Sequence, residues 1–243
     1  MEHQILIKSC WTDNLTTDFK NDFVRLANTV FGNYITEKYY RKKFSKNIYG
    51  PSLITIAYVD GRPAGTDVMW RNDLGRMKAY QTVDTCVLER FRGMGLLKKL
   101  TWQGLDVLGP DAFVYGFPNT NSFMGYVKMG WEVRYLYKTY RRPCTGDDID
   151  AKYAAWWMKC QTGIGHIQVR GNYYLVRKKK PAHMATLIGR VDDAAACLFP
   201  EEKGIWIVSS FATKPSIYNR NKTIPLVCNK PNMEVPYWKI DAI

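Results

Sequence analysis

Hydrophobic and polar positions follow two different periods along residues 1–143, and the changes of period divide this part of the chain into strands and helices. Short β-rich segments predict strands over 4–11, 78–88, 112–118 and 132–143, together with a hairpin within 52–73. Apolar residues at helical spacing predict helices within 15–32, 37–44, 96–110 and 119–131. The resulting order, β, α, α, β, β, β, α, β, α, β, is typical of a mixed α/β domain.

Local signals mark the ends of several helices. Thr16 or Thr17 can cap the first helix, and Gly32 can end it. In the fourth helix, we expect Asn121 or Ser122 to supply the N-cap.

The third helix follows a pair of glycines and ends at Gly109. Its apolar face is predicted to contain Leu97, Leu100, Val107 and Leu108. We expect this face to pack on the sheet.

A turn-rich segment, PCTGDD, follows residue 142 and predicts a boundary between a domain of residues 1–143 and a smaller α/β unit of residues 144–243. In the second unit, the pattern predicts a helix over 150–160, a hairpin over 166–180 and strands over 184–191, 204–211 and 223–229. The second unit carries no site motif of its own.

The composition is that of a folded protein, with 46% hydrophobic and 14% aromatic residues. No apolar run is long enough to span a bilayer and the N-terminus does not resemble a secretory leader, so we expect a cytoplasmic protein. The six cysteines are widely scattered and there are three histidines, a pattern that favours neither disulfides nor a bound metal.

A formal charge of +13 predicts an anionic partner. The basic runs are dispersed, at 41–43, 98–99, 141–142 and 177–180, and none lies in a zinc-finger, RNA-recognition or basic-zipper pattern. Nucleic acid is therefore an alternative partner that the sequence does not favour.

The segment ERFRGMGLLKKL, residues 89–100, places two glycines between a predicted strand and a basic helix. Such a loop either makes a plain turn or presents backbone N–H groups and the positive end of the helix dipole to an anion. The segment is neither a P-loop nor a dinucleotide fingerprint, because GKS or GKT and the third glycine are both missing.

The longer segment VDTCVLERFRGMGLLKKLT, residues 83–101, resembles the acyl-coenzyme A binding segment of the GNAT superfamily of N-acyltransferases. Val87, Arg92, Gly93 and Gly95 match the pattern Val-x-Pro-x-x-Arg-Gly-x-Gly. Glu89 replaces the usual proline, and Leu97 replaces a residue that is often small. A second register, beginning at Arg90, also fits, so the arginine that starts the motif stays open.

A second segment, GFPNTNSFMGYVKMGW at residues 116–131, is similar to the family's strand, Asn/Ser-bearing loop and short helix. The residues that carry this match are Asn119, Asn121, Ser122, Tyr126, Gly130 and Trp131. The two motifs occur in the order and at the spacing that the GNAT fold requires. The resemblance covers roughly residues 1–143 and implies a mostly antiparallel mixed sheet flanked by helices, with the second unit as a possible degenerate copy of the same fold.

The resemblance implies a coenzyme A thioester, acetyl-coenzyme A or a longer acyl-coenzyme A, as co-substrate, and no metal. The residues it assigns to coenzyme binding are Cys86, Val87, Arg90, Arg92, Gly93, Met94, Gly95, Leu96, Leu97, Asn119, Asn121 and Ser122. A backbone N–H near Cys86 or Val87 would hold the thioester oxygen, and Tyr126 would donate a proton to the departing thiolate. Asp84, on the strand that enters this site, is a candidate acceptor of the amine proton, or else a strand residue bound to a neighbouring loop.

The combined motifs resemble a GNAT branch of bacterial surface-polysaccharide biosynthesis, including O-antigen and lipopolysaccharide enzymes, that acylates nucleotide-linked amino deoxysugars. The resemblance implies direct transfer to the amino group of a dTDP- or UDP-sugar in a ternary complex, by a monomer or homodimer whose second unit covers the acceptor. Three alternatives stay open: another amine acceptor (aminoglycoside, polyamine, aminoacyl group or protein lysine), a non-catalytic acyl-coenzyme A binding module, and a basic nucleic-acid-binding module.

Overall fold

The computed structural model describes residues 3–140, 148–179, 184–203, 205, 207–212 and 223–235. The chain divides into two compact units, and each is described by itself. Unit 1 contains residues 1–133 and 227–233, and unit 2 contains residues 134–226 and 234–243. The predicted boundary at residue 143 falls outside the described residues. The two compact units divide after residue 133, and residues 227–233 return to unit 1.

The sheet of unit 1 is mostly antiparallel, with the strand order β1-β2-β3-β4-β5-β11. Its strands are β1 (Ile5–Trp11), β2 (Leu53–Val59), β3 (Arg62–Arg71), β4 (Ala79–Val87), β5 (Phe113–Gly116) and β11 (Thr223–Cys228). β4 and β5 pair in parallel, whereas β11 pairs antiparallel with β5. Only Val227 and Cys228 of β11 belong to unit 1, and they pair with β5 from far along the chain.

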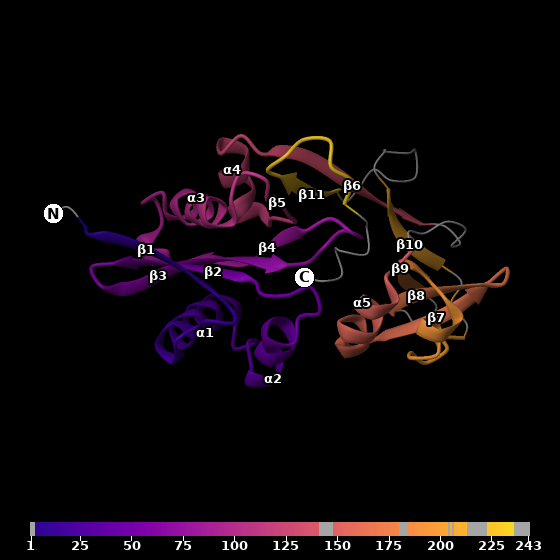
Figure 1. Ribbon diagram of the computed structural model, residues 1–243. Coiled ribbons are helices and arrows are strands. Elements are labelled where there is room, and N and C mark those ends of the chain that lie inside the picture. Colours follow the sequence, from indigo (N-terminus) through magenta and orange to yellow (C-terminus); the bar gives the residue numbers. More distant parts are fainter. Residues whose placement is uncertain are drawn as a thin grey trace. The chain divides into compact units, whose positions relative to one another are not determined.

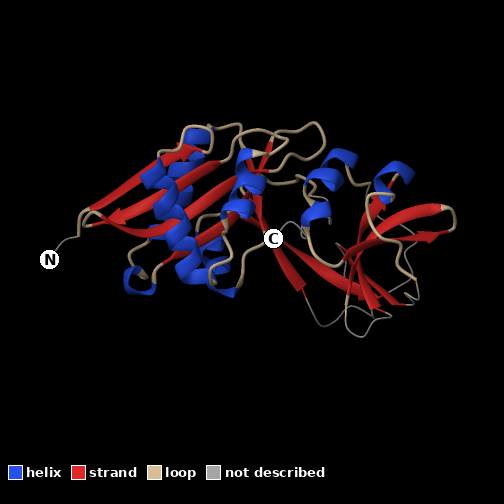
Figure 2. Ribbon diagram, turned by 90° about the horizontal axis from the view of Figure 1, so that it is seen from below, coloured by secondary structure: helices blue, strands red, loops and turns tan. Residues whose placement is uncertain are grey.

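Helices cover both faces of this sheet. They are α1 (Thr17–Phe31), α2 (Glu37–Tyr40), α3 (Leu96–Leu108) and α4 (Thr120–Lys128). Figure 1 shows α1 and α2 on one face and α3 and α4 on the other. Figure 2 shows the face that carries α1, with that helix lying across the strands. The predicted order of elements over residues 1–140 is confirmed.

The helix predicted over 37–44 is confirmed, with an α-helical part, Glu37–Tyr40, followed by a π-helical turn, Arg41–Ser45. Other predicted details of the helices are wrong, because tertiary contacts decide them. In α3 the buried residues are Leu96, Leu100, Thr101 and Gly104, whereas Val107, placed in the core by the pattern, is exposed. The cap of α4 is Asn119, whose side chain accepts from the N–H groups of Asn121 and Ser122.

Strand β4 contains an irregularity that changes its pairing on both sides. A bulge interrupts its register with β3 between the pairs Val68–Val83 and Thr66–Cys86, and Asp84 within it has a left-handed φ of 51°. On the other side, the pairing with β5 ends at Thr82–Gly116, although β4 continues to Val87. The two parallel strands therefore share a ladder over only part of β4.

In unit 2 the strands follow the order β6-β10-β9-β8-β7. Its strands are β6 (Glu132–Tyr140), β7 (Ile164–Val169), β8 (Asn172–Lys178), β9 (Met184–Val191) and β10 (Ile207–Ala212). Its helices are α5 (Ala151–Trp156) and α6 (Asp193–Ala196), with short 3-10 turns at Met158–Cys160 here and at Glu89–Phe91 in unit 1. A small core of apolar side chains, which includes Ile167, Tyr174 and Val176, packs on this sheet.

No helix in the described part of the chain is long and apolar enough to cross a membrane. Within the same residues, no cluster of three or more His, Cys, Asp or Glu side chains could hold a metal ion. Cys10, Cys86, Cys197 and Cys228 are free thiols.

Candidate active site

The bulge in β4 places Asp84 on the opposite face of the sheet from Thr82 and Thr85, although residues two apart share a face in a regular strand. Thr82 and Thr85 both hydrogen-bond to Asp67 of β3, which also contacts α3. Asp84 instead contacts Tyr34 and Lys43, which follow α1 and α2. Two buried carboxylates therefore lie on either side of β4 near the point where its pairing with β5 ends.

Asp67 is 1% exposed and is surrounded by threonine hydroxyls. Thr85 and Thr82 donate to Oδ1 over 2.7 and 2.9 Å, and Thr101 donates to Oδ2 over 2.9 Å. Among the described residues, no cation lies within salt-bridge distance of Asp67. Burial raises the pKa of this carboxyl, and the hydrogen bonds from the threonines oppose the rise only in part.

Tyr126 connects α4 to the same cluster. Its hydroxyl lies 2.8 Å from Thr82 Oγ1, and its ring is packed against Trp131 with ring centroids 4.9 Å apart. Burial raises the pKa of the phenol, and the nearby charge of Asp67 raises it further. A continuous hydrogen-bond chain thus joins Asp67, Thr82 and Tyr126.

Asp84 is held by a separate network on the other face. Lys43 donates to its Oδ2 over 3.0 Å, and the hydroxyl of Tyr34 donates to Oδ1. The ammonium of Lys43 also donates to the Tyr39 hydroxyl over 3.0 Å and lies 5.5 Å from the ring centroid of Trp70. Burial alone would lower the pKa of Lys43, but Asp84 and Tyr39 outweigh it and raise that pKa.

The glycine loop leads from β4 into α3. Gly93 and Gly95 have φ angles of 82° and 70°, and a Cβ at either position would meet no atom within 4 Å. Gly95 is the N-cap of α3, and no side chain caps this end. Since the first N–H groups of a helix have no partner within it, this end of α3 is suited to an anion. Arg90, Arg92, Lys98 and Lys99 are exposed around the loop.

The other predicted coenzyme residues lie in three places. Cys86 and Val87 lie on β4 beyond the last pair with β5, and the Cys86 thiol is buried, which raises its pKa to about 12. Asn119, Asn121 and Ser122 form the N-terminal turn of α4, where Asn119 Oδ1 is already occupied as the cap. Met94 and Leu96 belong to an apolar cluster with β2 and β3.

Leu97 occupies the space between α3 and α4. A Cβ added at Gly125 would come within 2.3 Å of Leu97 Cδ2, so the two helices approach closely at this glycine. The GNAT pattern often has a small residue where this chain has Leu97. The larger leucine side chain contacts α4 at Gly125.

Sequence reasoning missed the residues that surround Tyr126 and Asp84. The contacts of Asp67 with Thr82 and Thr101, of Thr82 with Tyr126 and of Lys43 with Asp84 join residues 15 to 44 positions apart along the chain. One signal was available: Asp67 is an acidic residue in the middle of a strand, β3, whose neighbours are buried. Buried carboxylates are rare and are often functional.

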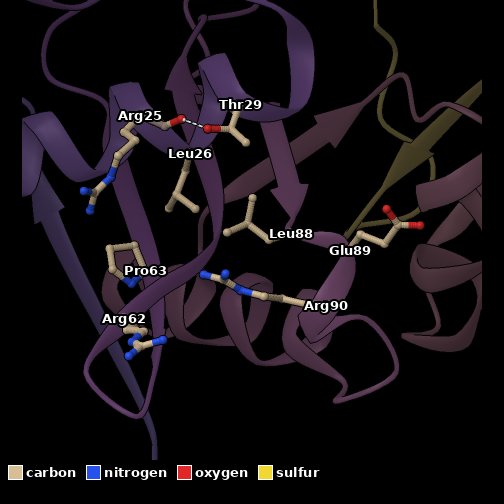
Figure 3. Close-up of a pocket in the computed structure, with 8 residues that line it drawn as sticks. All are labelled: Arg25, Leu26, Thr29, Arg62, Pro63, Leu88, Glu89 and Arg90. Carbon is tan, nitrogen blue, oxygen red and sulfur yellow. Dashed lines mark hydrogen bonds between the residues drawn. The ribbon is translucent and has the colours of Figure 1, made fainter.

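A pocket of about 690 Å³ lies beside the same glycine loop and is lined by α1, the start of β3 and the residues that follow β4. Its lining residues are Arg25, Leu26, Thr29, Arg62, Pro63, Leu88, Glu89 and Arg90. In Figure 3 the three guanidinium groups gather around Pro63, whereas Glu89 points to the opposite side.

No protein-family model matches the chain, and no curated protein matches its sequence. Among solved structures, a GCN5-related N-acetyltransferase from Kribbella flavida matches with a TM-score of 0.55 and 11% identity, over 93% of this chain and 71% of that one. A conserved protein of unknown function from Enterococcus faecalis V583, a probable N-acyltransferase, matches with a TM-score of 0.51 and 12% identity, over 93% and 72% of the two chains. These likenesses extend over most of both units, and they confirm the predicted fold class.

Proposed function

We propose that this protein is an acyl-coenzyme A dependent N-acyltransferase. The observation that carries this proposal is the end of the β4–β5 ladder at Thr82–Gly116, with the Tyr126 hydroxyl hydrogen-bonded there and an uncapped helix N-terminus further along the same strand. A thioester lying along the free part of β4 would have an anion site at one end and a proton donor at the other.

The glycine loop and α3 are the proposed site of the coenzyme pyrophosphate. The N–H groups after Gly93 and the exposed side chains of Arg90 and Arg92 are the groups suited to its charge. The open space around Gly93 and Gly95 would let the phosphates approach the backbone. An N–H of Cys86 or Val87 is the proposed donor to the thioester oxygen, which becomes more negative during attack.

Tyr126 is the proposed proton donor to the departing thiolate. Thr82 donates to Asp67 Oδ1 in the structure, and this hydrogen bond reverses when that oxygen is protonated. Thr82 can then donate to the phenol oxygen, and the phenol proton is directed away from these hydrogen-bonded groups. Transfer of the phenol proton to sulfur is followed by transfer from Thr82 to Tyr126 and from Asp67 to Thr82. The products of these steps are a thiol and an ionised Asp67, so protons and charge balance.

Asp84 is the proposed acceptor of the amine proton. Lys43 and Tyr34 stabilise its carboxylate charge, and a carboxylate oxygen that takes one hydrogen bond retains capacity for another. Asp84 and Asp67 contact elements on opposite faces of the sheet. In this scheme, the nucleophile loses its proton on one face and the leaving group gains its proton on the other.

The proposed acceptor is the amino group of a nucleotide-linked amino sugar. A charge of +13 and the arginine-lined pocket support an acceptor that carries phosphate. Other amines, such as aminoglycosides, polyamines and peptide amino groups, are the alternative acceptors, and they would not require the arginines.

Calorimetric titration with coenzyme A and acetyl-coenzyme A tests the first part of the proposal, with binding in the micromolar range expected. Thiol release is then measured with UDP- and dTDP-linked amino sugars, an aminoglycoside, spermidine and a peptide. Release with a nucleotide-linked sugar alone supports the full proposal, whereas release with another amine replaces the acceptor. Failure of both coenzymes to bind, with and without each amine present, would overturn the enzyme assignment.

A further inference from the structure

Three arginines from separate parts of the chain line one pocket in unit 1. Arg25 comes from α1, Arg62 from the first residue of β3 and Arg90 from the loop after β4. We infer that this pocket binds the phosphate group of a small molecule that also has a ring or apolar body. That this molecule is the acceptor rests on the proposed function.

The charges around the pocket favour an anion. Figure 3 shows the guanidinium groups on one side and the Glu89 carboxylate directed away from them. Asp22 pairs with Arg25 Nη2 over 2.7 Å, which leaves most of the five N–H donors of that guanidinium for a ligand. Planar guanidinium groups match the oxygens of phosphate better than ammonium groups do.

The volume and the apolar lining of the pocket indicate a ligand that is larger than a phosphate ion. Leu26, Pro63 and Leu88 supply apolar surface between the arginines. The Thr29 hydroxyl donates to the Arg25 carbonyl over 2.7 Å, and its oxygen can still accept from a ligand. About 690 Å³ is within the range of small-molecule sites and would hold a nucleoside or sugar beside its phosphate.

Arg90 borders both this pocket and the end of α3 proposed for the coenzyme, whereas the other lining residues belong to the pocket alone. Its α1 wall and helix α3 lie on opposite faces of the sheet, as Figure 1 shows. Helix α1 runs from Arg25 toward the loop that carries Tyr34, and the six steps from residue 25 to residue 31 span about 9 Å of helix. A phosphate in the pocket would thus lie on the same face of the sheet as the Asp84 network, where the proposed acceptor amine loses its proton.

The test uses UDP and inorganic pyrophosphate as probes, titrated calorimetrically into the full chain. Arg62→Gln should weaken UDP binding about tenfold, because a charge-assisted hydrogen bond is lost. Arg76→Gln, a change at an exposed arginine outside the pocket, is the matched control and should leave UDP binding unchanged. Pyrophosphate should bind more weakly than UDP, because it lacks the ring.

Coenzyme A is titrated into the same variants to separate the two proposals. Retained coenzyme binding in Arg62→Gln with lost UDP binding supports an acceptor pocket. Equal loss of both ligands would assign the arginines to the coenzyme and overturn the inference, as would absence of UDP binding or equal loss in Arg76→Gln. UDP binding without any coenzyme binding would leave a phosphate pocket in place and reject the enzyme function.

Discussion

The hydroxyl oxygens of Thr82 and Tyr126 lie 2.8 Å apart, so the phenol on α4 is joined to β4 at the last residue that pairs with β5. This contact connects the part of the sheet that opens to the helix that carries the proposed acid. The hydrogen-bond network continues from Thr82 to Asp67, a buried carboxyl with a raised pKa.

Tyr126→Phe should lower kcat by about 10² to 10³, because a positioned proton donor contributes on this order. The affinity for acetyl-coenzyme A should change little, since the ring and its packing on Trp131 are retained. Steady-state kinetics and calorimetry check the two effects separately. Thr101→Val, which removes a hydroxyl from Asp67 but not from the Tyr126 chain, is the control, and an equal fall in kcat there would contradict the assignment.

Asp67→Asn should become more stabilising relative to the wild type as the pH rises. The pKa of Asp67 is higher in the folded state than its ordinary value of 3.8. The contribution of the protonated carboxyl to the unfolding free energy is therefore fully present below pH 3.8, and it is lost as the pH rises toward the folded pKa. Asparagine does not titrate, and the difference in unfolding free energy should therefore grow by up to about 1.4 kcal/mol per pH unit across this interval. Urea unfolding from pH 4 to 8 measures it, and a constant difference would refute the prediction.

Lys43→Met should destabilise unit 1 by about 3–5 kcal/mol, because it leaves the Asp84 carboxylate buried without its cation. Adding Asp84→Asn should restore much of this loss, since the uncompensated charge is then removed. Denaturant unfolding of both variants checks the pair. As a control, Lys20→Met breaks the exposed pair with Glu37 and should lower the unfolding free energy by less than about 1 kcal/mol. An equally small loss for Lys43→Met would contradict the prediction that removing Lys43 leaves a costly buried charge.

Gly93→Glu should abolish coenzyme A binding, because its carboxylate would repel the pyrophosphate at the start of α3. Gly109→Glu, at the other end of the same helix, is a matched control for backbone strain. Both glycines have φ between 80° and 90°, and neither would bring a Cβ within 4 Å of another atom. Calorimetry on both variants, with circular dichroism to verify folding, distinguishes a binding defect from strain; loss in both would remove the assignment of the loop to the coenzyme.

Local patterns predicted most of the element order, because strands and helices in unit 1 have clear periods and end signals. Thr16 caps α1 and Gly32 ends it, as the sequence indicated. The same approach failed for α3, whose buried face is set by contact with the sheet: Leu96 is buried and Val107 is exposed. Apolar residues lie all around this helix, so periodicity could not choose the face.

The networks around the candidate site could not be predicted from local patterns. Lys43 and Asp84 are 41 positions apart and meet because a bulge in β4 directs Asp84 toward the turn after α2. Similarly, Asn119 caps α4 although Asn121 and Ser122 are equally suitable residue types. Residue type indicated the kind of contact, whereas the partner depended on the register of the strands.

The return of β11 to unit 1 has a consequence for synthesis on the ribosome. Val114 of β5 hydrogen-bonds to Asn229, a residue 115 positions later, so the edge of β5 has no β11 beside it while unit 2 is still being made. At typical translation rates of about 5–20 residues per second, this interval lasts roughly 6 to 23 s. During that time an unpaired strand edge is open to wrong pairing, and a chaperone that covers such edges would favour the yield of native chains.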